Sequence, residues 1–129
     1  MKNLEQIRAM NALEAVKRIE KHDKKGKGDK GGDVLTGFPA LILNNGLLAT
    51  IAFCKSKSKS NNKSGHELIC DELAVHLAHN DIHLLNPEQA STDGLLEHLT
   101  SNGSDRLRLC TTETMTYLNY LRRFAKSVE

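Results

Sequence analysis

The sequence predicts an all-α fold, a compact bundle of about five helices in a single domain that covers residues 1–129. The apolar residues are mostly Leu, Ala and Ile, and only five of the 129 side chains are aromatic. This mix favours helices over strands, which are enriched in β-branched and aromatic residues. Two prolines in the whole chain also argue against a sandwich of many short strands. The length fits one domain with one core.

The first helix is expected over about residues 3–24. Asn3 and Gln6 have the spacing of a capping box, in which each side chain binds the backbone N–H of the other residue. Apolar residues then recur near helical spacing, at Leu4, Ile7, Leu13, Val16 and Ile19. A run rich in lysine, glycine and aspartate follows, which predicts a flexible basic loop over about residues 24–36.

The second helix is expected over residues 38–54, beginning near Pro39. This stretch is apolar on nearly every side, which predicts the central, most buried helix. The central position would place Ala49 in the core, where a charge would be very costly. The tripeptide 44–46, Asn-Asn-Gly, would by itself suggest a turn that leaves two short helices. We favour one helix with a bend, in which Gly46 and Ala49 let a neighbouring helix approach closely.

A second flexible basic loop is predicted over residues 55–63, where lysine and serine alternate. Ser64 and Glu67 then form a capping box that starts a helix reaching about residue 79. Asn-Pro-Glu at residues 86–88 marks a turn or a new helix start, and a short helix covers residues 94–100.

The last helix is expected to begin after Ser104, which can cap it. Its apolar stripe runs through Leu107, Cys110, Thr114, Tyr117, Leu118, Leu121, Phe124 and Val128.

Charge is unevenly distributed along the chain. The net charge of +2 is the sum of +7 over residues 1–63, −7 over residues 64–100 and +2 over residues 101–129. This predicts a dipolar surface, with one side for a polyanion and another for a basic partner, provided that the two halves do not fold over each other. The alternative is a charged surface that only keeps the protein in solution.

Three histidines are the strongest candidates for a metal site. His76, His79 and His83 are spaced so that they could share one helical face. A structural zinc site needs four ligands, and no HExxH pattern is present, so polar histidines at a helix end are the favoured interpretation. Because no catalytic arrangement of nucleophile, base or paired carboxylates stands out, the sequence predicts no enzyme, no catalytic residue, no metal and no cofactor.

The three cysteines, Cys54, Cys70 and Cys110, are odd in number and widely spaced. They do not suggest a disulfide framework, and buried thiols in a reducing cytoplasm are expected. No stretch reaches the roughly 18 apolar residues that span a bilayer, and residues 1–8 lack the apolar run of a secretory signal. A cytoplasmic protein without a membrane partner is expected.

Basic residues recur in three segments, and phosphate backbones need such charges and little else. Aromatic side chains for base stacking are nearly absent from these segments, which favours contact with the nucleic-acid backbone over reading of single-stranded bases. The candidate nucleic-acid-binding residues are Lys17, Arg18, Lys21, Lys24, Lys25, Lys55, Lys57, Arg122, Arg123 and Lys126.

The stretch 37–53, GFPALILNNGLLATIAF, resembles the signature of the small helical subunit of the type III-B CRISPR effector, the Cmr complex. Residues 8–12 (RAMNA) resemble the first helix of that family. Residues 111–113 (TTE) and 118–125 (LNYLRRFA) resemble its last helix. These matches lie in the first, second and last expected helices, while residues 55–105 match only in pattern.

The resemblance implies a non-catalytic subunit of an RNA-guided ribonucleoprotein in antiviral defence. Its partners would be guide and target RNA, the backbone subunit that cleaves RNA, and other copies of itself. Base pairing would read the sequence, while the protein would read shape and charge. The basic side would then meet phosphate, and the acidic segment a partner subunit.

Two other functions stay open on the sequence alone. The chain could be a helical protein–protein adaptor without direct RNA contact, which a salt-dependent RNA affinity would exclude. It could also be a metal-dependent helical enzyme built on the three histidines, which metal analysis of the purified protein would decide.

Overall fold

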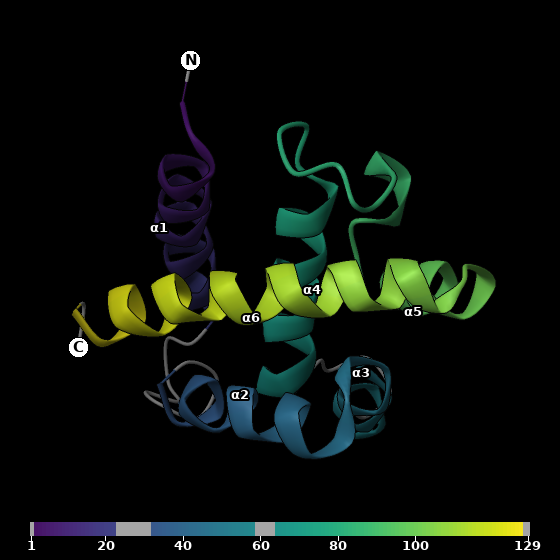
Figure 1. Ribbon diagram of the computed structural model, residues 1–129. Coiled ribbons are helices and arrows are strands. Elements are labelled where there is room, and N and C mark those ends of the chain that lie inside the picture. The colour runs from purple at the N-terminus through teal and green to yellow at the C-terminus, as the bar shows by residue number, and fades with distance from the viewer. Residues whose placement is uncertain (1, 23–31, 59–63, 128–129) are drawn as a thin grey trace.

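The computed structural model describes residues 2–22, 32–58 and 64–127 (Figure 1). No strand occurs within these ranges, so the predicted all-α fold is confirmed, with six α-helices where the sequence predicts about five. In chain order the elements are α1 (Leu4–His22), α2 (Gly32–Asn45), α3 (Leu47–Ser56), α4 (Gly65–Ala78), the 3₁₀ turn η1 (Pro87–Gln89), α5 (Thr92–Ser101) and α6 (Ser104–Ser127).

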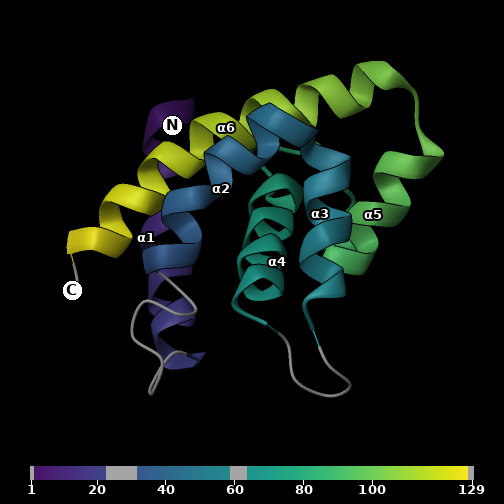
Figure 2. The same cartoon turned by 90° about the horizontal axis from the view of Figure 1, so that it is seen from below.

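Helix α4 lies at the centre of the molecule and packs against each of the other five α-helices. Figure 2 shows α1 on one side of it and α3 with α5 on the other, while α6 runs across α1 and α4. The prediction that residues 38–54 form the central helix is therefore wrong. Helix α4 holds that place through six apolar residues that are buried: Ile69, Cys70, Leu73, Ala74, Leu77 and Ala78.

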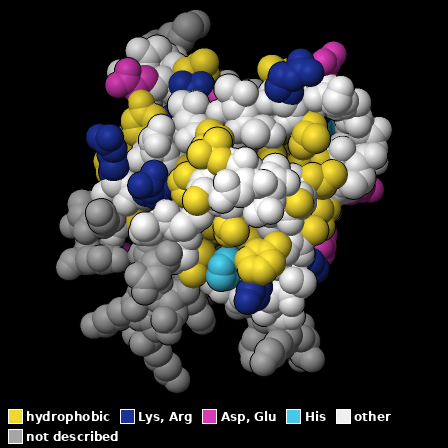
Figure 3. Space-filling view, turned by 60° about the horizontal axis from the view of Figure 1, so that its bottom comes forward, with side chains coloured by type: hydrophobic (Ala, Val, Ile, Leu, Met, Phe, Trp, Pro, Cys, Tyr) yellow, Lys and Arg dark blue, Asp and Glu magenta, His cyan; other side chains and the backbone are white. Residues whose placement is uncertain are grey.

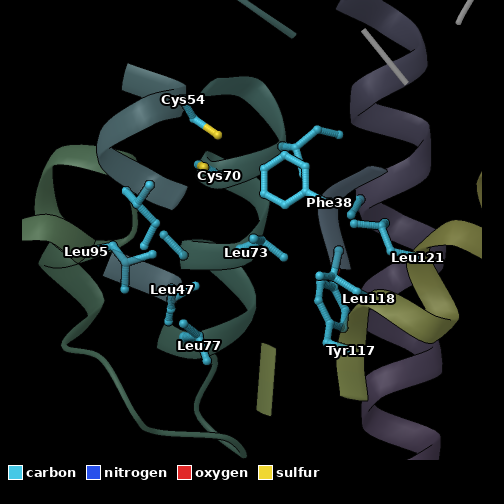
Figure 4. Packing of buried hydrophobic residues seen from close by; sticks show 14 of the residues in the cluster. Phe38, Leu47, Cys54, Cys70, Leu73, Leu77, Leu95, Tyr117, Leu118 and Leu121 are labelled. Carbon is cyan, nitrogen blue, oxygen red and sulfur yellow. The ribbon is translucent and has the colours of Figure 1, made fainter. Parts of the chain in front are cut away.

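The core is a single cluster of apolar side chains on both sides of α4. Figure 4 shows Leu73 of α4 between two groups of side chains. One group includes Phe38 of α2 with Tyr117 and Leu118 of α6, and the other includes Leu47 of α3. All three cysteines are buried in this cluster as free thiols, as the sequence predicts.

Side-chain caps start α1 and α4 where the sequence predicts them. In α1 the backbone N–H of Gln6 donates to Asn3 Oδ1 and that of Asn3 donates to Gln6 Oε1, both at 2.9 Å. In α4 the N–H of Glu67 donates to Ser64 Oγ at 3.1 Å. The other half of this second box differs, because Ser58 Oγ accepts from the Ser64 N–H at 3.0 Å and donates to the Glu67 carboxylate. Ser58 thus ties the end of α3 to the start of α4.

The second predicted helix is in fact two helices that meet at Gly46. Gly46 has φ 88° and ψ 158°, a backbone conformation that is essentially restricted to glycine. Its N–H donates to Ile42 O at 2.7 Å, and its carbonyl accepts from Thr50 N at 3.1 Å, so the corner connects both helices. Ala49 is exposed just beyond this corner, and the expectation that it lies in the core is wrong.

Helix α2 also begins earlier than predicted. It starts at Gly32, inside the range 24–36 that the sequence predicts as a loop, and Pro39 lies within it. Helix α3 likewise reaches Ser56, into the second predicted loop. Lys57 and Ser58 follow α3 without regular structure, and residues 24–31 and 59–63 of the two predicted loops lie outside the described residues.

The substitution Gly46→Ala is expected to lower the free energy of unfolding by about 1–3 kcal/mol, because a Cβ strains the backbone at this positive φ. Urea unfolding measures the loss. Gly37→Ala is the matched control, since Gly37 is an exposed residue of α2 with no neighbouring atom within 4 Å of a built Cβ. That control should be neutral or slightly stabilising. Equal stability of the Gly46→Ala variant and the wild type would contradict a requirement for glycine at the corner.

A network of polar side chains lies between α1, α4 and α6, in which His76 and Glu113 are buried and Arg8 and Asn11 are half-buried. The guanidinium of Arg8 donates to both carboxylate oxygens of Glu113, at 2.7 and 2.8 Å. His76 Nε2 donates to Glu113 Oε2 at 2.8 Å, and its Nδ1 accepts from Asn11 Nδ2 at 3.0 Å. The ring of Tyr117 stacks on His76 with the centroids 3.8 Å apart. The network therefore joins three helices through groups that are hydrogen-bonded to one another.

Burial and hydrogen bonding shift two pKa values in this network. Burial lowers the pKa of His76 below its ordinary value of 6.5, against the opposing effect of Glu113. Burial alone would raise the pKa of Glu113, but the hydrogen bonds from Arg8 and His76 outweigh it and lower that pKa to about 2. At neutral pH the folded protein thus holds a neutral imidazole against an ionised carboxylate.

The free energy of unfolding is expected to fall as the pH is lowered from neutrality. Below pH 6.5 His76 becomes protonated in the unfolded chain, whereas in the folded protein its lowered pKa keeps it neutral. Glu113, also with a lowered pKa, adds a second loss of stability that begins near pH 4.5 and is complete at about pH 2. In both windows the unfolded state binds more protons, so acid favours unfolding.

Urea unfolding across this pH range checks the expectation. The variant Glu113→Gln should lose the part of the acid destabilisation that Glu113 causes, because residue 113 then carries no carboxyl group. A wild-type free energy of unfolding that stays constant down to pH 3 would contradict the lowered pKa values of His76 and Glu113.

Candidate nucleic-acid interface

The acidic segment 64–100 folds against basic residues of the N-terminal half. Arg18 Nη2 lies 2.7 Å from Glu72 Oε1, and its Nε donates to the same carboxylate at 3.0 Å. The hydrogen bond to Glu72 raises the pKa of Arg18. Opposite charges that are far apart in the sequence therefore meet in the fold, which reduces the charge separation that the sequence predicts.

Lys55 makes the same kind of contact. Its Nζ lies 3.3 Å from Glu67 Oε2 and 3.1 Å from Asp93 Oδ1, so it joins the end of α3 to α4 and α5. Hydrogen bonds to Asp93 and Glu67 raise the pKa of Lys55. Two predicted nucleic-acid-binding residues, Arg18 and Lys55, are thus engaged with acidic side chains of the same chain.

Two lysines of α1 are exposed, as contact with a nucleic acid would require. Lys17 and Lys21 are four residues apart on α1, which places them on one side of the helix. Lys17 is 72% exposed, and its ammonium lies 3.5 Å from Glu14, an exposed neighbour on the same helix. Such surface pairs contribute little and are easily exchanged for another anion. Lys21 is exposed as well and forms no ion pair with any described residue.

The basic residues of α6 are placed near its C-terminal end. Arg123 is exposed and Arg122 is half-buried, and neither forms an ion pair with the described part of the chain. Both ribbon views show the C-terminal part of α6 at the same end of the molecule as α1 (Figures 1 and 2). The structure thus brings the basic segments of α1 and α6 to one end. Lys24 and Lys25 lie outside the described residues, as does the side chain of Lys126.

Lys57 lies against an aromatic side chain that sequence reasoning missed. Its ammonium is 5.1 Å from the ring centroid of Phe53. His66, near the start of α4, meets the same ring edge-on at 5.7 Å. In three dimensions the second basic segment therefore does have an aromatic side chain beside it, contrary to the expectation from the sequence. The spacing of Phe53 and Lys57, four residues apart at the end of a helix, is the signal that could have found this pair.

The surface that α2 and α3 form carries no acidic or basic side chain over residues 34–54. In Figure 3 hydrophobic side chains are spread over this face, and charged side chains lie mostly around its margin. Leu43 of α2 is 74% exposed there. An apolar surface of this kind is typical of contact with another protein.

The three histidines do not share a helical face. Helix α4 ends at Ala78, so His79 is its C-terminal cap and His83 follows beyond the helix with a positive φ of 53°. His76 is buried, and both of its ring nitrogens are hydrogen-bonded. Within the ranges that the structure covers, no group of three or more His, Cys, Asp or Glu side chains is arranged to hold a metal ion.

Comparison with protein families identifies a match for nearly the whole chain. A family model described as "CRISPR-associated protein (Cas_Cmr5)" matches residues 4–128. No curated protein matches the chain. None of the described helices is both long and apolar enough to cross a membrane.

Proposed function

Because the chain belongs to the CRISPR-associated Cas_Cmr5 family, the small subunit of the type III-B complex, we propose that it is a non-catalytic subunit of an RNA-guided ribonucleoprotein in antiviral defence. The single observation that carries this proposal is the family match over residues 4–128, which includes every helix of the fold. The proposed partners are guide and target RNA, the backbone subunit and other copies of this chain.

A non-catalytic role is supported by the position of the most enzyme-like pair of side chains. His76 and Glu113 are hydrogen-bonded, as a base and its orienting carboxylate would be. However, His76 is only 1% exposed and lies beneath the ring of Tyr117, while Arg8 occupies the carboxylate. A substrate has no access to this pair, which is better explained as part of the packing.

Contact with the RNA backbone is supported by the basic end of the molecule. Lys17, Lys21 and Arg123 extend from α1 and α6 into solvent without a strong internal partner. Side chains of this kind bind phosphates without regard to base sequence. This suits a complex in which base pairing reads the sequence and the protein reads shape and charge.

Contact with neighbouring subunits is supported by two other surfaces. The uncharged face of α2 and α3 can bury apolar area against a protein. The segment between α4 and α5 keeps Asp81 and Glu88 exposed, which leaves acidic groups for a basic partner. The cysteines are buried free thiols, as suits a protein of the reducing cytoplasm, which is where we place this function.

A helical adaptor without RNA contact is the second candidate. It is favoured by the internal ion pairs of Arg18 and Lys55, which use two of the predicted phosphate-binding groups within the fold. A salt-dependent affinity for RNA separates the two functions, since only the RNA-contacting subunit should show it.

Purification of a tagged chain from its host tests the proposal directly. We expect the other subunits of the complex and a small guide RNA to come with it. Recovery of the protein partners without RNA would favour the adaptor, and recovery of the chain alone would contradict both functions.

The double substitution Lys17→Glu and Lys21→Glu is expected to weaken RNA binding by the assembled complex for every sequence alike. Each lost phosphate contact should flatten the slope of log affinity against log salt by about 0.7 to 0.9. Fluorescence anisotropy with labelled RNA at several salt concentrations measures both effects. Arg108→Glu is the control, because Arg108 is exposed but lies near the start of α6, outside the predicted set. Unchanged affinity in the double variant would mean that α1 does not face the RNA.

A further inference from the structure

We propose that Phe53, Lys57 and His66 form a stacking site for one unpaired base of an RNA strand, with Lys57 placed to contact the adjoining phosphate. This inference rests on the proposed function, because it assumes that the chain meets RNA. It adds a kind of contact that the basic residues alone do not supply, namely contact with a base rather than with the backbone.

The site lies where α3 ends and α4 begins. Phe53 belongs to the last turns of α3, Lys57 caps that helix, and His66 is the second residue of α4. Residues of two elements therefore converge on one ring, which His66 meets edge-on at 5.7 Å. Figure 3 shows a histidine and a basic side chain beside hydrophobic side chains on this part of the surface.

The ring of Phe53 is exposed to solvent and does not belong to the core. It is 40% exposed, whereas Phe38 on the other side of His66 is fully buried. Among the large hydrophobic side chains that are exposed in the described part of the chain, Phe53 is the one aromatic residue. An exposed aromatic ring offers a flat surface on which any base can stack.

The neighbours of the ring hold it in place and supply charge. His66 also lies against the buried ring of Phe38, with centroids 6.3 Å apart, and this contact with the core restricts the histidine side chain. Burial and the nearby Lys57 lower the pKa of His66, which keeps the imidazole neutral at physiological pH. Lys57 itself is exposed, and its ammonium, 5.1 Å from the ring centroid, can turn to a phosphate when a base occupies the ring.

These features favour RNA over a protein as the occupant. A protein contact would be expected to use the aliphatic side chains of the uncharged face, of which Leu43 is the most exposed. Phe53 differs from them because a cation lies beside it. An aromatic ring combined with a basic side chain is the arrangement by which single-stranded nucleic acid is bound without sequence preference.

An NMR titration of the full-length chain tests the site, because this method detects weak binding. The probes are oligo(A) and an abasic oligonucleotide of the same length and charge. We expect oligo(A) to shift the ring resonances of Phe53 and His66, since a stacked base adds its own ring current. The abasic probe should shift resonances of lysines and leave both rings unchanged. Ring resonances that stay unchanged while oligo(A) shifts residues elsewhere would overturn the inference.

Affinity measurements on variants separate stacking from charge. Phe53→Leu keeps an apolar side chain and should weaken oligo(A) binding by a factor of about 5 or more, with an unchanged salt slope. Lys57→Gln should flatten the salt slope by about 0.7. Leu43→Ala is the matched control for an exposed hydrophobic residue, and we expect it to bind oligo(A) like the wild type. Phe53→Leu with wild-type affinity would also overturn the inference.

Failure of the inference and failure of the proposed function give different results. If the proposed function fails, the complex purified from the host carries no RNA. If only the inference fails, the complex carries RNA, but Phe53→Leu binds it like the wild type. A Phe53→Leu variant that binds RNA normally and loses its partner subunits would assign Phe53 to a protein contact and would overturn the stacking site.

Discussion

Replacing Glu113 by alanine is expected to lower the free energy of unfolding by about 3 kcal/mol, because it removes the partner of the half-buried Arg8 guanidinium and the acceptor of the buried His76 Nε2–H. Glu113 is 8% exposed and accepts hydrogen bonds from both Arg8 and His76. In the variant the guanidinium of Arg8 and the Nε2–H of His76 lose their shared acceptor between α1, α4 and α6.

Urea unfolding at neutral pH measures this loss. Glu14→Ala is the matched control, since Glu14 is an exposed residue of α1 whose only described ion pair, at 3.5 Å, is with Lys17. We expect the control to change the free energy of unfolding by less than about 0.5 kcal/mol. Similar small effects for both variants would mean that the buried network contributes little to stability.

Replacing Phe38 by alanine is expected to cost about 4 kcal/mol, the largest effect of any single substitution considered for this chain. Its ring is fully buried and lies on the same side of Leu73 as Tyr117 and Leu118 (Figure 4). Truncation removes apolar contact and leaves a cavity that the surrounding helices can only partly close.

Thermal unfolding followed by circular dichroism gives the change in melting temperature, and urea unfolding gives the free energy. Phe53→Ala serves as the control, because it removes the same atoms from a ring that is 40% exposed. Since hydrophobic stabilisation follows the apolar area removed from water, this control should lose distinctly less. A loss for Phe38→Ala no greater than that of the control would contradict the position assigned to Phe38.

Local signals in the sequence predicted the helices whose ends are set by nearby residues. Asn3 and Ser64 cap α1 and α4 as expected, because a cap needs only residues within one turn. The last helix, expected from Ser104 onward, also matches α6, which ends at Ser127. Its expected stripe contributes Cys110, Tyr117 and other residues to the core.

Asn-Asn-Gly at residues 44–46 indicated a possible break, but one helix with a bend was favoured, because the apolar run on both sides of Gly46 fits one long helix as well as two short ones. The start of α2 at Gly32 was missed for a related reason. Gly32 and Asp33, the first two residues of the helix, are poor helix formers when taken alone, and tertiary packing overrides that preference. In both places the local preferences of the residues do not by themselves determine where the helix begins.

The sequence identified the basic residues of the candidate interface but not how the fold arranges them. Charge counts identified Lys17, Lys21 and Arg123, which the structure leaves exposed. The same counts could not reveal that Arg18 and Lys55 are paired with acids 54 and 38 residues away in the chain. Such pairs depend on how the helices pack. The proximity of His66 to Phe53 depends on the packing of α3 against α4 in the same way.

The contacts between α1 and α6 have a consequence for the order of folding during synthesis. The Arg8–Glu113 pair and the hydrogen bond from the Tyr117 hydroxyl to the Asn11 carbonyl link residues that are 105 and 106 positions apart. Helix α1 leaves the ribosome before α6 and must therefore wait for it before its buried side chains find their partners. Until then its apolar side is open to water or to a chaperone. Closing so long a loop slows folding, and a chain that stops before α6 cannot bury α1 in the native way.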